Sequence, residues 1–143
     1  MQHFQRTFFG CWSLLFLLFA YWQWNDPDPT LWVSIYGFAA LMAGTAAAGR
    51  FPMPVLITVF FLGLAGFAYM YPGAVGDWIA QEWQQQDLSM KTQRMEEARE
   101  AFGLLIVAAV LGLAALIGWR ENGQKQKNLH LIKKKSHKIY RGK

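Results

Sequence analysis

The sequence offers little cysteine or histidine chemistry. Its one cysteine, Cys11, lies within an apolar run, so an intramolecular disulfide and a cysteine metal cluster are both excluded. The three histidines, His3, His130 and His137, lie in the terminal segments without the spacing of a zinc or haem site. The sequence therefore names no cofactor, and side-chain packing has to hold the fold.

Formal charge is missing from long stretches of the chain. Of 143 residues, 54% are hydrophobic and 16% are charged, and four runs of 17 to 19 residues carry no charge: residues 8–24, 31–48, 53–71 and 102–119. A hydrocarbon core about 30 Å thick is crossed by about 20 helical residues. The pattern predicts an all-α membrane protein, a four-transmembrane-helix bundle formed by residues 1–120.

The breaks between these runs predict how the helices connect. Residues 25–29 and 49–52 contain Pro or Gly and are short enough for tight turns. The longer stretch, residues 72–95, has an amphipathic start and predicts a partly helical outer loop between helices 3 and 4. Small residues four apart in the second run, Ala39, Ala43 and Ala47, indicate a close helix seam, within one chain or between two copies.

Basic residues are concentrated at the C-terminus. Nine of the 14 Lys and Arg residues lie from Arg120 onward, whereas eight of the nine acids lie near the ends of the runs opposite Arg6 and Arg50. This split predicts a multi-pass protein of the cell membrane, a bacterial inner membrane by its compact loops, with both termini in the cytoplasm. Residues 121–143 are expected to form a flexible basic tail that contacts anionic lipid. Charge confined to a tail does not indicate nucleic-acid binding.

The first polar motif ends the first run. Its candidate ligand-binding residues, with two aromatic residues of the second run, are Gln23, Asn25, Asp26, Asp28, Trp32 and Tyr36. Each Asp precedes a Pro, which favours an extended backbone at the Asp. Asp28 is also suited to capping a helix that begins at Pro29. A helix end followed by a helix start would account for the motif without any ligand.

The second polar motif precedes the fourth run. Its candidate residues are Glu96, Glu97, Arg99 and Glu100. Glu96, Arg99 and Glu100 share one helix face, and ordinary intrahelical ion pairs would contribute only about 0.3–0.5 kcal/mol each. A cation this close to the hydrocarbon requires a partner. We therefore expect Arg99 to face Asp26 or Asp28 of the first motif.

Together these motifs resemble the transmembrane protein 220 family. The resemblance rests on Gln-x-Asn-Asp-Pro-Asp from Gln23, on Trp32 and Tyr36, and on Glu-Glu-x-Arg-Glu-x-x-Gly from Glu96 to Gly103. It covers the whole span region and implies a multi-span membrane protein, but it carries over no activity. The basic tail after Trp119 is not part of that pattern.

Three classes of function remain open. The acids Asp26, Asp28, Glu96 and Glu100 offer oxygen ligands for a metal cation, or the cluster with Arg99 binds a lipid headgroup. Alternatively the motifs only join helices in a non-catalytic assembly or scaffold subunit, with a membrane protein partner or as a homo-oligomer. A membrane enzyme acting near headgroups is less favoured, because the outer face carries no histidine and no candidate nucleophile.

Overall fold

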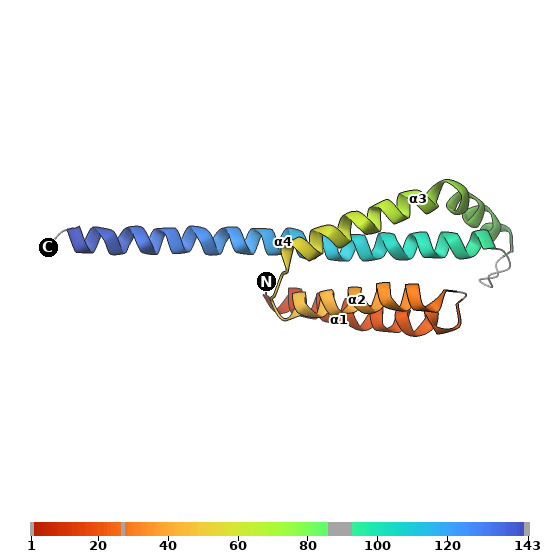
Figure 1. The fold of residues 1–143 in the computed structure, drawn as a ribbon, viewed down its shortest axis with the longest axis horizontal. Coiled ribbons are helices and arrows are strands. Elements are labelled where there is room, and N and C mark those ends of the chain that lie inside the picture. The colour runs from red at the N-terminus through yellow and green to blue at the C-terminus, as the bar shows by residue number, and fades with distance from the viewer. Residues whose placement is uncertain (1, 27, 86–92, 142–143) are drawn as a thin grey trace.

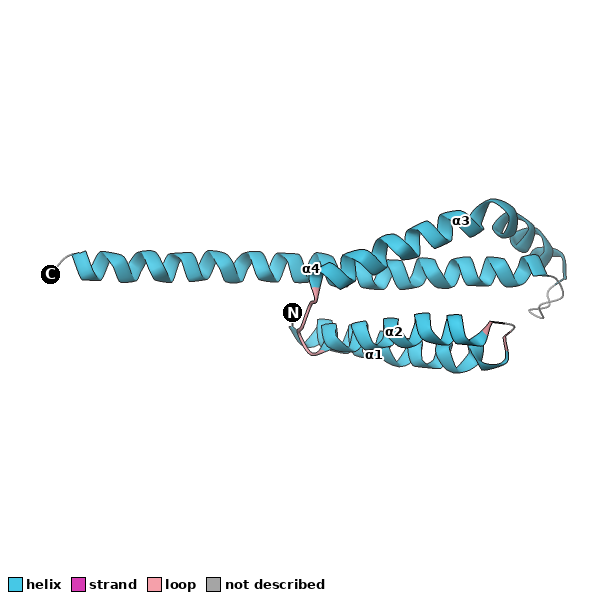
Figure 2. Ribbon diagram, in the orientation of Figure 1, coloured by secondary structure: helices cyan, strands magenta, loops and turns pink. Residues whose placement is uncertain are grey.

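The described part of the chain folds into four helices and one short 3₁₀ turn (Figures 1 and 2). A computed structural model describes residues 2–26, 28–85 and 93–141, and the side chains in these ranges except residues 2, 72–85, 93–96 and 135–141. No strand occurs in these ranges. The elements are α1 (Gln2–Trp22), η1 (Gln23–Asn25), α2 (Pro29–Ala47), α3 (Met53–Gln85) and α4 (Gln93–Arg141).

The helices form two antiparallel hairpins. α1 packs along α2, α3 packs along α4, and α2 also contacts α4, which brings the hairpins together. As Figure 1 shows, the N-terminus and the connection from α2 to α3 lie at one end of the bundle, and η1 lies at the other. This end-to-end arrangement agrees with the charge split in the sequence.

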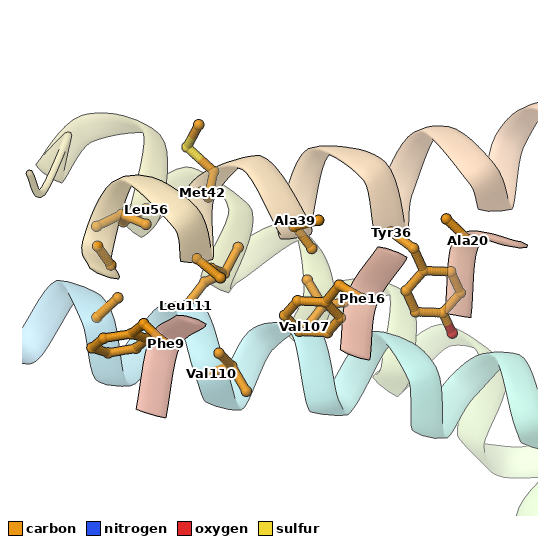
Figure 3. Close-up of a cluster of buried hydrophobic side chains, with 14 of the residues drawn as sticks. Phe9, Phe16, Ala20, Tyr36, Ala39, Met42, Leu56, Val107, Val110 and Leu111 are labelled. Carbon is orange, nitrogen blue, oxygen red and sulfur yellow. The ribbon is translucent and has the colours of Figure 1, made fainter. Parts of the chain in front are cut away.

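The core runs between the hairpins. Phe9 and Phe16 of α1 are fully buried with Ala39 of α2 and Leu111 of α4, and Figure 3 shows their rings beside the α4 residues. Because lipid tails are as apolar as these side chains, close packing rather than escape from water must hold such helices together. The buried Ala39 and its neighbours on α2 therefore form a seam inside one chain.

Glycines allow the closest helix approach within the second hairpin. A Cβ atom at Gly63 of α3 would lie 3.0 Å from the Ala108 Cβ atom of α4, and one at Gly112 would lie 2.6 Å from the Phe60 ring. In the first hairpin, the Ser13 hydroxyl donates to the Ala40 carbonyl oxygen at 2.8 Å. Both hairpins thus use small or short side chains at their seams, as expected for helices packed in a bilayer.

Three helical segments are long and apolar enough to cross a membrane: Pro29–Ala47, Met53–Tyr71 and Glu97–Lys134. α1, predicted as the first of four spans, is not among them. Although α1 has 21 residues, Gln2, His3, Gln5 and Arg6 make its first turns polar, so its apolar part is shorter than the about 20 residues that cross a hydrocarbon core. The fold is all-helical, with three candidate spans in the described part of the chain.

Two helices extend beyond their predicted ends. α3 continues through Pro72 to Gln85, and Figure 1 shows it bending sharply in its green part; proline is a common cause of such kinks in continuous helices. The predicted end of the third helix at Pro72 is therefore wrong. The remainder of the predicted outer loop, residues 86–92, lies outside the described residues.

α4 continues as a helix to Arg141, although the sequence predicts a flexible segment from residue 121. At 1.5 Å per residue its 49 residues extend over about 70 Å, more than twice the hydrocarbon thickness. In Figure 1 the C-terminal half projects past the bundle as a single helix, and the described side chains of residues 122–134 are all exposed. The basic residues thus lie on a helix that leaves the bundle.

Candidate functional site

The two polar motifs meet at the η1 end of the bundle. Gln23 lies in η1 and is 6% exposed. Asp26 follows the turn with φ −76° and ψ 161°, an extended conformation that a following proline favours. Arg99 lies on the opposite hairpin, in the first turns of α4.

Arg99 joins the hairpins through a direct ion pair. Its Nη2 atom donates to Asp26 Oδ2 at 2.7 Å and to Gln23 Oε1 at 3.4 Å. The side chains of Arg99 and Asp26 are 38% and 9% exposed, so the pair is only partly open to solvent and is screened less than a surface pair. The prediction that Arg99 faces one of the two aspartates is confirmed.

The guanidinium of Arg99 has donors left over. Its two hydrogen bonds to described residues leave from Nη2, and its Nε atom is buried with no hydrogen-bond partner among those residues. An arginine carries five N–H donors. Asp26 therefore fixes the position of the guanidinium group but leaves N–H donors of Arg99 without a described hydrogen-bond partner.

Aromatic rings form the layer beneath the ion pair. The Tyr36 ring lies 6.5 Å from the Phe16 ring, 5.7 Å from the Phe19 ring and 6.2 Å from the Trp32 ring. A Cβ atom at Gly103 of α4 would collide with the Tyr36 hydroxyl oxygen. Gly103 therefore leaves room for Tyr36, a contact that the sequence did not indicate although both residues belong to the resemblance.

The other candidates lie apart from the pair or only partly within it. Asn25 and Asp28 are exposed, whereas Glu97 and Glu100 are partly buried. Glu100 interacts with its surroundings. The side chain of Glu96 is outside the described set, so its predicted place in the cluster stays a prediction.

Asp28 departs from its predicted role. It occupies the N-cap position before Pro29, but its carboxylate makes no capping hydrogen bond. Its backbone angles, φ −118° and ψ 59°, fall outside the extended region that capping residues usually adopt, which explains why the side chain does not reach the free N–H groups. The expected side-chain cap is absent, and the carboxylate is available to other partners.

Metal ligands do not converge within the described part of the chain. No group of three or more His, Cys, Asp or Glu side chains there is placed to hold a metal ion. Of the predicted metal ligands, Asp26 is already paired with Arg99. Ca²⁺ requires six to eight oxygen ligands, and because the Glu96 side chain lies outside the described set, the predicted metal site stays a prediction.

The ion pair predicts energetic coupling between the hairpins. Arg99→Ala should destabilise the protein by leaving a largely buried Asp26 carboxylate unpaired. A double-mutant cycle with Asp26→Asn, measured by thermal unfolding in detergent, should give a coupling of about 0.5–3 kcal/mol. Asp28→Asn is the matched control and should show no coupling to Arg99. Coupling below about 0.5 kcal/mol for Asp26 would contradict the pair.

The contact between Gly103 and Tyr36 predicts a rescue. Gly103→Ala should lower the melting temperature, because its methyl group overlaps the Tyr36 hydroxyl; overpacking of this kind typically costs about 1–3 kcal/mol. Adding Tyr36→Phe removes the clashing oxygen and should recover most of the loss. Gly37→Ala, whose added Cβ atom meets nothing within 4 Å, should not be helped by Tyr36→Phe. A double variant less stable than Gly103→Ala alone would refute the contact.

Comparison with known proteins identifies the family. A family model described as "Transmembrane family 220, helix" matches residues 15–116, a region that includes both polar motifs and the Tyr36–Gly103 contact. The comparisons with curated proteins and with solved structures found no match. The matched region covers more than half of the 143 residues, and its apolar helices are those of an integral membrane protein. The chain belongs to transmembrane family 220.

Proposed function

We propose that this protein binds the headgroup of a membrane phospholipid at the η1 end of the bundle, without catalysing a reaction. The observation that carries the proposal is the Asp28 carboxylate, which is exposed and makes no hydrogen bond or ion pair with any described residue. A free acid at the membrane boundary attracts a cationic group. The ammonium group of a phosphatidylethanolamine headgroup is such a partner.

Asp28 lies beside a path into the hydrocarbon. A groove of about 540 Å³ at the start of α2 is lined by Asp28, Thr30, Leu31 and Ser34. Leu31 and Ser34 also line a second groove, of about 380 Å³, between α2 and the α3–α4 hairpin. A headgroup beside Asp28 can therefore extend an acyl chain along the second groove, whose lining is almost wholly apolar.

Arg99 supplies the complementary charge for the phosphate. Its side chain is 38% exposed and uses Nη2 alone for its hydrogen bonds to described residues, so further donors remain for a phosphate oxygen. A headgroup with both signs of charge suits this end better than a metal ion does, because Asp26 is occupied by Arg99. Asp28 and Arg99 are thus the binding residues we propose.

A second candidate is a scaffold that assembles with another membrane protein or a second copy. The direct Arg99–Asp26 pair favours it, because paired charges can serve the fold alone. The surface of α3 favours it too: in the most apolar 18 residues of each helix, 11% are buried in α3, against 39% in α2 and 50% in α4. Much of α3 is therefore left for lipid or for a protein partner.

We also propose four spans, with both termini in the cytoplasm. α1 packs antiparallel along α2 over a similar length and turns Leu14 and Leu17 outward. A bilayer that covers α2 would cover these leucines as well. The connection from α2 to α3, which contains Arg50, and the basic end of α4 lie at the end of the bundle where the N-terminus lies (Figure 1), and positive charge favours the cytoplasmic side.

Lipid binding predicts a headgroup preference that depends on Asp28. In native mass spectrometry from neutral detergent, the wild type should retain phosphatidylethanolamine over phosphatidylcholine, because a trimethylated amine donates no hydrogen bond. Asp28→Asn should weaken phosphatidylethanolamine binding about tenfold, the value of one charge-assisted hydrogen bond. Glu121→Gln removes an acid at the other end and should change nothing. Equal retention of both lipids by the wild type would contradict the proposed lipid site and favour the scaffold function.

The proposed orientation predicts which side of the membrane is labelled. Single cysteines replace Thr30 and Gln124, both exposed, in a Cys11→Ser background. An impermeant thiol reagent added to intact cells should label the Thr30→Cys protein, and Gln124→Cys only after permeabilisation. The reverse pattern would invert the topology. Labelling of both sites in intact cells would place Thr30 and Gln124 on the same side of the membrane, which would contradict the three crossings proposed between them.

A further inference from the structure

A large apolar groove lies on the face of the second hairpin that turns away from the first. Its volume is about 730 Å³, within the usual range of about 300–1,000 Å³ for ligand pockets. Ala109 and Gly112 of α4 keep it open where larger side chains would fill it, and Phe61, Leu116 and Trp119 form its walls. The core residues of α4, such as Leu111, lie on the opposite face of that helix.

One end of this groove meets the connection from α2 to α3. A Cβ atom at Gly118 would lie 2.5 Å from Phe51 Cβ and 2.9 Å from Met53 Sδ, so the connection rests directly on the last apolar turn of α4. Met53 and Trp119 line the groove at this end. Tryptophan is the side chain that prefers the headgroup boundary, which places the mouth of the groove at the membrane surface.

This close contact brings two arginines to the mouth. Arg50 directly precedes Phe51, and Arg120 directly follows Trp119. Both are exposed, and neither makes a side-chain hydrogen bond or ion pair with any described residue. The neighbouring acid, Glu121, is partly buried. One acid beside two arginines leaves a net positive charge. An apolar groove thus ends near two chain segments that each carry an exposed arginine without a hydrogen bond or ion pair to a described residue.

We propose that this groove binds an anionic phospholipid, with an acyl chain between α3 and α4 and the phosphate held by Arg50 and Arg120. Charge complementarity selects this occupant, because guanidinium groups bind phosphate through paired hydrogen bonds. Basic pockets between membrane helices recognise acidic headgroups in the same way. The site lies at the opposite end of the bundle from Asp28 and shares no residue with the ethanolamine-lipid site.

The test compares two lipids that differ in headgroup charge. The full chain in neutral detergent is titrated with phosphatidylglycerol or phosphatidylcholine, and bound lipid is counted by native mass spectrometry. The wild type should hold one phosphatidylglycerol well above the affinity of the others. Arg50→Gln with Arg120→Gln should weaken that site about 25-fold, since each basic side chain near an anionic headgroup contributes about fivefold.

The matched control removes the same charge from the projecting helix. Lys125→Gln with Lys127→Gln changes two exposed cations beyond the mouth and should leave the tight site intact. Ala109→Phe fills the groove without altering charge and should weaken the same site. Asp28→Asn should not affect it, so failure here is distinguishable from failure of the ethanolamine-lipid site.

Three results would overturn the proposal. Equal affinity of the wild type for the two lipids would exclude an anionic site. Equal losses in the arginine and lysine double variants would mean diffuse attraction to the basic helix. Unchanged binding in Ala109→Phe would mean that the acyl chain does not occupy the groove. Circular dichroism on each variant establishes that it is folded, and Arg120→Gln alone, expected to lose about fivefold, replaces the double variant if that one unfolds.

Discussion

The partly buried cation of Arg99 needs an acid, and that acid lies on the other hairpin. Apart from this pair, the two hairpins meet mainly where α2 runs beside α4. The bond of Arg99 to Asp26 and its weaker one to Gln23 therefore fix the end of α4 against η1. The same register brings Gly103 under the Tyr36 hydroxyl and Leu111 beside Phe9 and Phe16. Removing the charge would thus disturb packing well below it.

The bilayer explains why the remaining contacts look as they do. Without water to drive apolar side chains together, helices associate where backbones approach closely. Gly63 against Ala108 and Gly112 against Phe60 provide such approaches within the second hairpin, as Ser13 and Ala40 do in the first. Large apolar side chains such as Phe61 and Leu62 of α3 are exposed, as expected for a surface that faces lipid.

Charge at the two ends of the bundle is used in different ways. At the η1 end, Asp26 and Arg99 pair with each other across the two hairpins, while the Asp28 carboxylate makes no capping hydrogen bond. At the other end, Arg50 and Arg120 are both exposed, and Arg120 directly follows Trp119, which lines the α3–α4 groove. This difference underlies our two proposals: a headgroup carrying an ammonium group at the first end, and an acidic headgroup at the second. Each proposal also uses an apolar groove with room for an acyl chain.

The sequence by itself determined the class of the protein, because apolar runs and charge placement depend on composition along the chain. It predicted an all-helical membrane protein, its family and the pairing of Arg99 with an aspartate, since a cation beside hydrocarbon needs a partner. Local rules were less reliable at helix ends: Pro72 did not stop α3, and Asp28 did not cap α2. Only the tertiary structure decided that Asp26 is the partner, that Gly103 accommodates Tyr36, and that the connection from α2 to α3 packs against Gly118 of α4. These contacts join residues far apart in the chain, and their geometry depends on how the two hairpins pack, which no local pattern encodes.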